Sequence, residues 1–152
     1  MIPVVASAAP LGAPEMAPAT GLLLALFFVL LNGFFVAAEF ALVKVRATQI
    51  DPLVAQGLRR ATVARHMIAH MDAYLSATQL GITLASLALG WIGEPAFGHL
   101  VEPLARRIPG ATDATVRSAS LVTAFLVITI LHIVLGELAP KSVAIRKQKP
   151  TT

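Results

Sequence analysis

The chain of 152 residues is rich in apolar residues and poor in charge: 57% are hydrophobic, 13% are charged, and the mean hydropathy is +0.78. Soluble domains carry about 25% charged residues, so this composition excludes an ordinary soluble domain and indicates a membrane protein. The absence of cysteine excludes disulfides and thiolate metal sites. The net charge of +4 gathers beside apolar stretches, without a basic face that carries aromatic residues, so we expect no nucleic-acid binding.

Three stretches without Asp, Glu, Lys or Arg predict three membrane-spanning helices. They are residues 16–38, 73–93 and 118–136, each close to the roughly 20 residues that a helix needs to cross the hydrocarbon layer. The expected parts of this all-α membrane protein are an external tail at 1–16, a transmembrane domain at 17–148, and spans near 17–45, 72–97 and 116–139. Lys and Arg are in excess after the first and third spans, which predicts an external N-terminus and a cytoplasmic C-terminus.

Asn32 and Gly33 lie midway along the first span and predict an interruption of its helix. Asn32 offers an amide oxygen, and Gly33 weakens the helix and permits close backbone approach. Glu39 follows Asn32 by seven residues, so both face one side of the helix. A packing notch with an interhelical hydrogen bond explains the Asn–Gly pair equally well, so a ligand role and a packing role both remain open.

The segment after the first span predicts short amphipathic helices on the cytoplasmic side, at about 51–70, with basic residues directed toward anionic lipid headgroups. Asp51 and Pro52 fit an N-cap followed by the first helical residue. Gly57 is expected to divide the segment. His66 and His70 are four residues apart, as metal ligands on a helix often are, but no third ligand lies nearby and we expect surface histidines.

The second span carries small and polar residues on a single stripe, because their spacings alternate between three and four. They are Ser76, Gln79, Thr83, Ser86, Gly90 and Gly93. Small residues on one face of a membrane helix indicate tight helix packing. An oxygen-lined path for a cation has the same pattern, so the stripe leaves both interpretations open.

In the third span, His132 and Gly136 share one face, and Glu137 follows the uncharged run directly. An ionisable group at the edge of hydrocarbon is costly and marks a candidate functional site. Pro140 has no N–H, so we expect it to break the helix and to free the carbonyl of Gly136. Carboxylate and carbonyl oxygens are ligands that Mg²⁺ selects. A helix end with a glutamate at the water interface is the alternative.

Three motifs in this order resemble the transmembrane domain of the CorC/CNNM (cyclin M) family of magnesium transporters. They are Leu31-Asn32-Gly33-Phe34-Phe35-Val36-Ala37-Ala38-Glu39-Phe40-Ala41, Gln79-Leu80-Gly81-Ile82-Thr83-Leu84-Ala85-Ser86-Leu87 and Gly136-Glu137-Leu138-Ala139-Pro140-Lys141. The resemblance implies a homodimeric three-helix domain that moves Mg²⁺, with Na⁺ as a candidate coupling ion. The ion site that it implies consists of Asn32, Gly33, Ser86, Gly136 and Glu137. In the family, cytoplasmic CBS domains and a terminal domain usually follow. We expect these domains to be absent from this chain and ATP to act only through them.

We therefore expect Mg²⁺ transport across the plasma (inner) membrane, by a domain surrounded by lipid. The alternative function is a membrane anchor or sensor for CBS domains without transport of its own. An enzyme is not expected, because no nucleophile–base pair occurs at motif spacing. Further candidate residues for the ion pathway are Glu39, Gln79, Thr83 and His132.

The depths of the candidate ligands present a difficulty. At about 1.5 Å per residue, straight helices place Asn32 at mid-membrane, Ser86 nearer the outside and Glu137 nearer the cytoplasm. Helix breaks at Gly33, Gly81 and Pro140, or helix tilts, are ways to bring the three together. Alternatively, Thr83 or Gln79 is the ligand that the second span supplies.

Overall fold

The computed structural model describes residues 17–146; the expected external tail at 1–16 and the last residues of the chain lie outside the described part. The elements are α1 (Pro18–Lys44), α2 (Ala47–Ala55), α3 (Arg59–Ala69), α4 (Met71–Ala105), α5 (Asp113–Leu131), the π-helix η1 (His132–Leu138) and α6 (Ala139–Arg146). Three helical stretches are long and apolar enough to cross a membrane: Pro18–Lys44, Met71–Ala105 and Asp113–Val143. The predicted all-α fold with three spans is confirmed, and residues 17–146 contain no strand.

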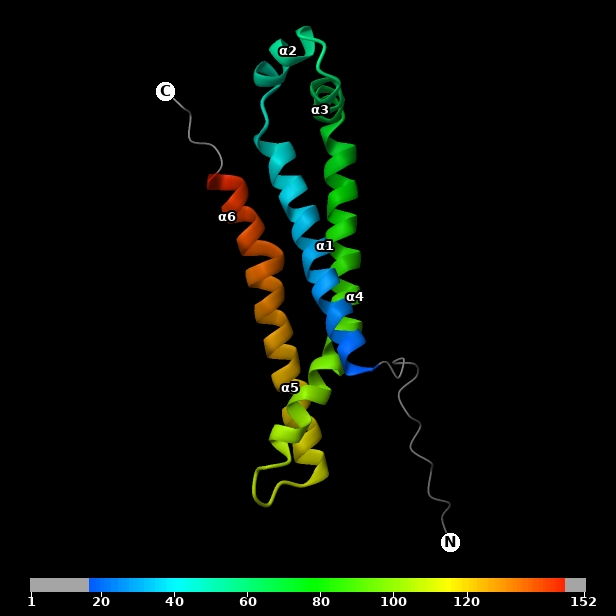
Figure 1. Ribbon diagram of the computed structural model, residues 1–152, viewed down its shortest axis with the longest axis vertical. Coiled ribbons are helices and arrows are strands. Elements are labelled where there is room, and N and C mark those ends of the chain that lie inside the picture. The colour runs from blue at the N-terminus through cyan, green and yellow to red at the C-terminus, as the bar shows by residue number, and fades with distance from the viewer. Residues whose placement is uncertain (1–16, 147–152) are drawn as a thin grey trace.

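The three long helical stretches run side by side, with α4 packed along both α1 and α5, and with η1 and α6 packed on α1 (Figure 1). Helices α2 and α3 lie at one end of the bundle, which we call the cap end, near the end of α6. The connection between α4 and α5, residues 106–112, lies at the opposite end, which we call the turn end. The chain therefore has two distinct ends joined by three apolar helices.

Helix α4 extends to Ala105, well beyond the expected end of the second span near residue 97. A proline removes one helical hydrogen bond and usually kinks or ends a helix, yet Pro95 and Pro103 both lie inside α4. Figure 1 shows that α4 bends toward α5 in its last part. On the other side of the turn, Thr112 caps α5 by accepting the N–H of Thr115 at 3.3 Å. Helices α4 and α5 thus both extend toward the turn end beyond their uncharged segments.

The connection at the cap end differs from the sequence prediction at its start. Helix α2 begins at Ala47, so Asp51 is not an N-cap and Pro52 lies inside the helix. The Asp51 carboxylate is instead engaged by Arg65 of α3 at 2.7 Å, while Pro52 deprives only the Thr48 carbonyl of its usual partner. The expected division at Gly57 is confirmed: this residue has a φ of +75°, a conformation that favours glycine, and separates α2 from α3.

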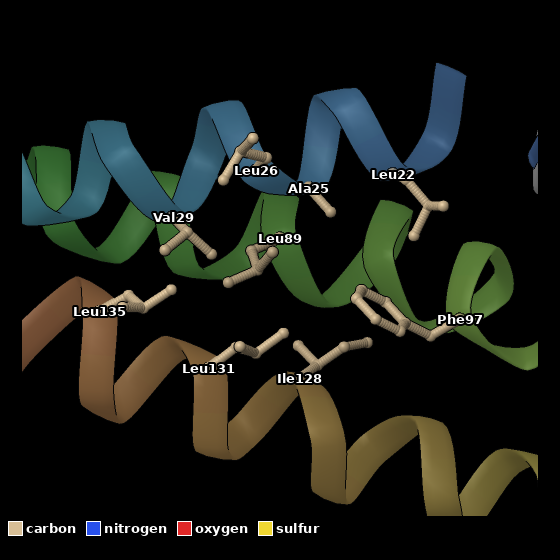
Figure 2. Close-up of a pocket in the computed structure, with 9 residues that line it drawn as sticks. All are labelled: Leu22, Ala25, Leu26, Val29, Leu89, Phe97, Ile128, Leu131 and Leu135. Carbon is tan, nitrogen blue, oxygen red and sulfur yellow. The ribbon is translucent and has the colours of Figure 1, made fainter. Parts of the chain in front are cut away.

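An apolar core joins the three spans on the turn-end side of Asn32. Its buried members are Ala25, Val29, Leu89 and Ile128. A cavity of about 130 Å³ lies in this region. Apolar side chains from α1, α4, α5 and η1 line it (Figure 2). Cavities of this kind stay dry. The lining of this cavity therefore offers no polar partner to a water or an ion.

Candidate cation site

Polar groups from three helical segments meet at Asn32, which is 2% exposed. The Nδ2 of Asn32 donates a hydrogen bond to the Gly136 carbonyl of η1 at 3.1 Å. The hydroxyl of Ser86, on α4, donates to the Oδ1 of Asn32 at 3.3 Å. Asn32 and Ser86, which straight helices separate by depth, are thus in contact, so the expected difficulty does not arise for these two residues. We call Asn32, Ser86, His132 and Gly136 the Asn32 junction.

His132 is the fourth member of the Asn32 junction. Its Nε2 lies 3.2 Å from the Ser86 hydroxyl oxygen. A serine hydroxyl has a single proton, so donation to Asn32 requires that Nε2 of His132 carry a proton and donate to Ser86. The hydrogen-bonded chain then runs from His132 through Ser86 and Asn32 to the Gly136 carbonyl. All four groups are neutral when the imidazole is neutral.

Two glycines allow α1 to come this close to η1. A Cβ atom on Gly136 would lie 2.9 Å from Asn32 Nδ2 and 3.0 Å from His132 Cδ2, and a Cβ atom on Gly33 would lie 3.1 Å from Pro140 Cγ. Helix α1 nevertheless runs without interruption from Pro18 to Lys44. The expected break at Asn32-Gly33 is therefore wrong: Gly33 provides room for the neighbouring segment while the helix continues.

Pro140 does not end the helix, since the chain remains helical to Arg146, but the regular α-helix is interrupted just before it. The segment before Pro140 is the π-helix His132–Leu138. In a regular α-helix the Pro140 ring would clash with the Gly136 carbonyl and would leave it without an N–H partner. A wider π-helical turn relieves such a conflict, and π-helical turns are frequent at functional sites. The Gly136 carbonyl accepts the side chain of Asn32.

The structure does not bring Glu137 into the Asn32 junction. Its carboxylate forms an ion pair with Lys141, one turn later on the same helical stretch, and its side chain is 47% exposed. The ammonium group of Lys141 also lies 5.4 Å from the centre of the Phe40 ring. Within residues 17–146, the Glu137 side chain accepts one hydrogen bond, and its donor is Lys141. The carboxylate next to the junction thus has a counter-ion of its own.

The remaining pathway candidates do not contact the junction through hydrogen bonds in the described part of the chain. The hydroxyl of Thr83 donates to the Gln79 carbonyl of its own helix at 2.9 Å, and both residues are exposed. Glu39 is half-buried. The hydroxyl of Ser76 likewise donates to a carbonyl of its own helix, that of Asp72. Among the hydroxyl residues of the stripe on α4, Ser86 is the one that donates to another helix.

Residues 17–146 contain no group of three or more His, Cys, Asp or Glu side chains that could hold a metal ion. His66 and His70 lie with their ring centres 4.3 Å apart on the exposed side of α3, where the His70 ring bonds to the backbone of His66. Any cation at the Asn32 junction would therefore be bound mainly by uncharged oxygens. The spacing of His132 and Gly136 in the sequence indicates this site. The contact between Ser86 and His132 could not be predicted from the sequence, because it depends on the approach of two helices.

Comparison with known proteins identifies the family. The family profile described as "Cyclin M transmembrane N-terminal domain" matches residues 23–152. The chain belongs to the cyclin M family. It is 50% identical over 124 residues to "UPF0053 protein YhdT" of Bacillus subtilis (strain 168), covering 82% of this chain and 27% of that protein. It is 45% identical over 126 residues to "UPF0053 protein YugS" of the same organism, covering 82% and 29%.

A relative of lower identity is "Uncharacterized protein Rv1841c" of Mycobacterium tuberculosis (strain ATCC 25618 / H37Rv), 36% identical over 126 residues, with 83% of this chain and 35% of that protein covered. The chain spans about a third or less of the length of these relatives. No solved structure gives a significant match. The family and the three spans together make the chain a membrane protein.

Proposed function

We propose that this domain carries Mg²⁺ across the membrane and that the Asn32 junction forms part of the transported ion's site. The observation that carries the proposal is the convergence of an amide, a hydroxyl and a backbone carbonyl from three helical segments at a buried point. Oxygens of these kinds are ligands for hard cations, and Mg²⁺ in particular is bound through oxygen. Membership of the cyclin M family supports a role in the membrane.

Binding of a cation requires the junction to change its hydrogen bonds. Asn32 now presents an N–H to the Gly136 carbonyl, and its Oδ1 accepts the Ser86 proton. A cation between these oxygens would replace both hydrogen bonds, with the Asn32 amide turned so that its oxygen faces the ion. A site with few charges would bind Mg²⁺ weakly enough for release, as transport needs.

Glu137 would supply the negative charge of this site. It follows Gly136 directly, and its ion pair with Lys141 provides a counter-ion in the absence of a bound cation. Binding of Mg²⁺ would exchange the ammonium group for the metal ion. Because Mg²⁺ prefers about six oxygen ligands, waters or further protein oxygens would complete the coordination.

The proposed setting is the plasma membrane, with the cap end and the C-terminus on the cytoplasmic side and with two copies of the chain forming a homodimer. Lys and Arg near the cap end support this orientation. Three helices enclose little space by themselves, so a second copy would shield polar groups from lipid. Coupling to Na⁺ belongs to the same proposal. Regulation by ATP would act through cytoplasmic domains, for which the longer relatives leave room.

One observation favours the alternative of an anchor or sensor without transport. The Asn32 junction satisfies its own hydrogen bonds without any ion, as a purely structural contact between helices does. An anchor needs this contact only for stability. A transporter also needs the Glu137 carboxylate, which the contact does not use.

The test is Mg²⁺ binding by calorimetry together with flux into liposomes, compared for Mg²⁺, Ca²⁺ and Na⁺. Replacement of Glu137 by Gln should abolish Mg²⁺ binding and flux while the protein keeps its fold and its dimeric state. Replacement of the exposed Asp72 by Asn, on α4, is the matched control and should leave both unchanged. If the Glu137→Gln protein binds Mg²⁺ as the unaltered chain does, the ion site is misassigned and the anchor is favoured.

A further inference from the structure

Two spaces lead from the Asn32 junction toward the turn end, and they differ in polarity. The first is the dry cavity at the centre of the bundle, whose lining residues are all apolar. The second is a groove of about 220 Å³ between α4 and α5. Leu89 and Ile128 line both spaces and separate them. A cation that leaves the junction toward the turn end would avoid the centre of the bundle, because it would lose its oxygen ligands there.

The groove begins at the junction and carries polar groups along its length. Ser86 and His132 line its inner end, Gly90 and Thr129 follow on the facing helices, and Glu94 lies at its far end. Gly90 leaves open space, since a Cβ atom there would meet nothing within 4 Å. The inner part of the groove is thus continuous with the hydrogen-bonded chain of the Asn32 junction.

A wider space of about 770 Å³ continues from Glu94 to the turn end, again between α4 and α5. Ser120 lines it, and the hydroxyl of this residue is buried and has no hydrogen-bond partner within residues 17–146. A buried hydroxyl without a partner costs free energy comparable to a lost hydrogen bond. The wider space thus borders a polar group whose hydrogen bond no described residue supplies.

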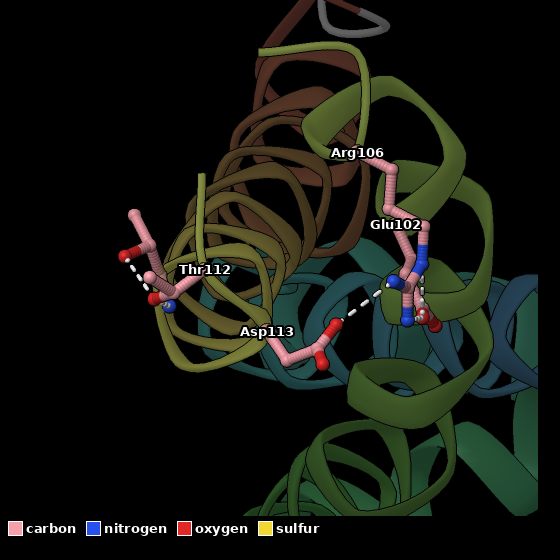
Figure 3. Close-up of polar contacts among 5 residues, drawn as sticks. Glu102, Arg106, Thr112 and Asp113 are labelled. Carbon is pink, nitrogen blue, oxygen red and sulfur yellow. Dashed lines mark hydrogen bonds and ion pairs between the residues drawn. The ribbon is translucent and has the colours of Figure 1, made fainter. Parts of the chain in front are cut away.

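The charged residues that line the wider space are three carboxylates, Glu94, Glu102 and Asp113, and two guanidinium groups, Arg106 and Arg117. Glu94 is the carboxylate that lines both spaces. Arg106 is held by Glu102 at 2.7 Å and by Asp113 at 3.0 Å (Figure 3). These hydrogen bonds, that of Glu102 foremost, raise the pKa of Arg106 above its ordinary value, so its charge persists and is balanced. Glu94 takes part in no ion pair among the described residues.

From these observations we propose that the groove between α4 and α5 is the route by which a divalent cation passes between the Asn32 junction and the turn-end side of the membrane. Glu94 attracts the hydrated cation at the point where the wide space narrows. The proposal rests on the proposed function for the identity of the ion. The route itself is a property of α4 and α5 and is tested without transport.

Because the chain has no cysteine, single cysteines report which surfaces contact water. In the full chain in liposomes, Arg107→Cys marks the turn end and Gln56→Cys marks the cap end. A charged, membrane-impermeant thiol reagent should modify Gly90→Cys from the same side as Arg107→Cys. Leu84→Cys, on a different face of α4 and exposed to lipid, should react several-fold more slowly. Millimolar Mg²⁺ should slow the reaction at Gly90→Cys but not at Arg107→Cys.

The route would be overturned if the reagent modified Gly90→Cys only from the cap-end side, the side marked by Gln56→Cys. It would also be overturned if Gly90→Cys reacted no faster than Leu84→Cys. Glu94→Gln provides a second measurement: Mg²⁺ flux should fall several-fold, whereas Asp72→Asn, on the same helix but outside the groove, should not change it. Unchanged flux in the Glu94→Gln protein would remove Glu94 from the route. If the domain does not carry Mg²⁺, the result is different: the reagent would still modify Gly90→Cys from the turn-end side, but Mg²⁺ would not slow the reaction.

Discussion

The Asn32 junction and the ion pairs of the turn end are opposite ways to use polar groups in one small bundle. In the junction, uncharged groups join three helical segments at 3.1 to 3.3 Å, and Asn32 is 2% exposed. At the turn end, charged groups pair at 2.7 and 3.0 Å, but the Arg106 side chain is 55% exposed. Exposed pairs add little to stability, whereas a buried group that loses its partner is costly. Burial therefore decides which region holds the helices in place.

The largest effect should follow replacement of Asn32 by Leu. The two side chains have similar size, but the substitution leaves the buried Gly136 carbonyl without its side-chain donor and removes the acceptor of the Ser86 hydroxyl, which keeps only its contact with His132. Each loss costs about 1–3 kcal/mol, so we expect a free energy of unfolding lower by about 3 kcal/mol and no Mg²⁺ binding. Unfolding in mixed detergent micelles and calorimetry measure the two quantities. A stability equal to that of the unaltered chain would contradict the comparison.

Gly136→Ala should have the next largest effect, because the added Cβ atom would lie 2.9 Å from Asn32 Nδ2. Overpacking of this kind costs about 1–3 kcal/mol. The matched control is Gly98→Ala, also on a helix, where a Cβ atom would meet nothing within 4 Å. Thermal unfolding in detergent should show a lower midpoint for the first protein and no decrease for the second. Equal midpoints would mean that η1 and α1 are not tightly packed.

Pro140→Ala tests the backbone of the junction without removal of a side-chain oxygen. The restored N–H would favour a regular α-helical turn and draw the Gly136 carbonyl away from Asn32. Loss of one of about six ligands predicts a clear but partial decrease in Mg²⁺ affinity, smaller than that of Glu137→Gln. Calorimetry measures the affinity, and circular dichroism verifies the fold. An unchanged affinity would remove the Gly136 carbonyl from the site.

Lys141→Met should act in the opposite direction, since it removes the counter-ion that competes for Glu137. A partly exposed pair contributes up to about 1 kcal/mol, so the affinity for Mg²⁺ should rise by about threefold. Lys141→Arg keeps the positive charge and serves as the control with little change. Mg²⁺ affinity that falls in the Met variant would show that Lys141 supports the site.

The smallest effect is expected at the turn end. Asp113→Asn removes one ion pair of Arg106, while Glu102 still holds the guanidinium group. The free energy of unfolding should fall by about 0.5 kcal/mol or less, and the difference should shrink further as salt is added. Unfolding at low and high ionic strength measures it. A loss similar to that of Asn32→Leu would erase the distinction between the two regions.

Much of the fold is predictable because its causes are local. Uncharged stretches of about 20 residues specify three spans wherever they occur, and Gly57 separates two short helices through its own backbone conformation. The extent of the helices was less predictable. Pro95 and Pro103 indicate a loop by local rules, yet they lie within α4, which packs against α5.

By itself, the sequence determined the all-α membrane fold, the family resemblance and the residues in which a cation site was to be sought. The ion pair of Glu137 with Lys141 is local, because the two residues are four apart on one helical stretch. Tertiary structure alone decided that Asn32, Ser86 and Gly136 are in contact and that His132 joins them. The physical reason is that a hydrogen bond between helices depends on their depth, tilt and rotation. These are fixed by packing of whole faces, such as Gly33 against Pro140, and not by any one segment of the chain.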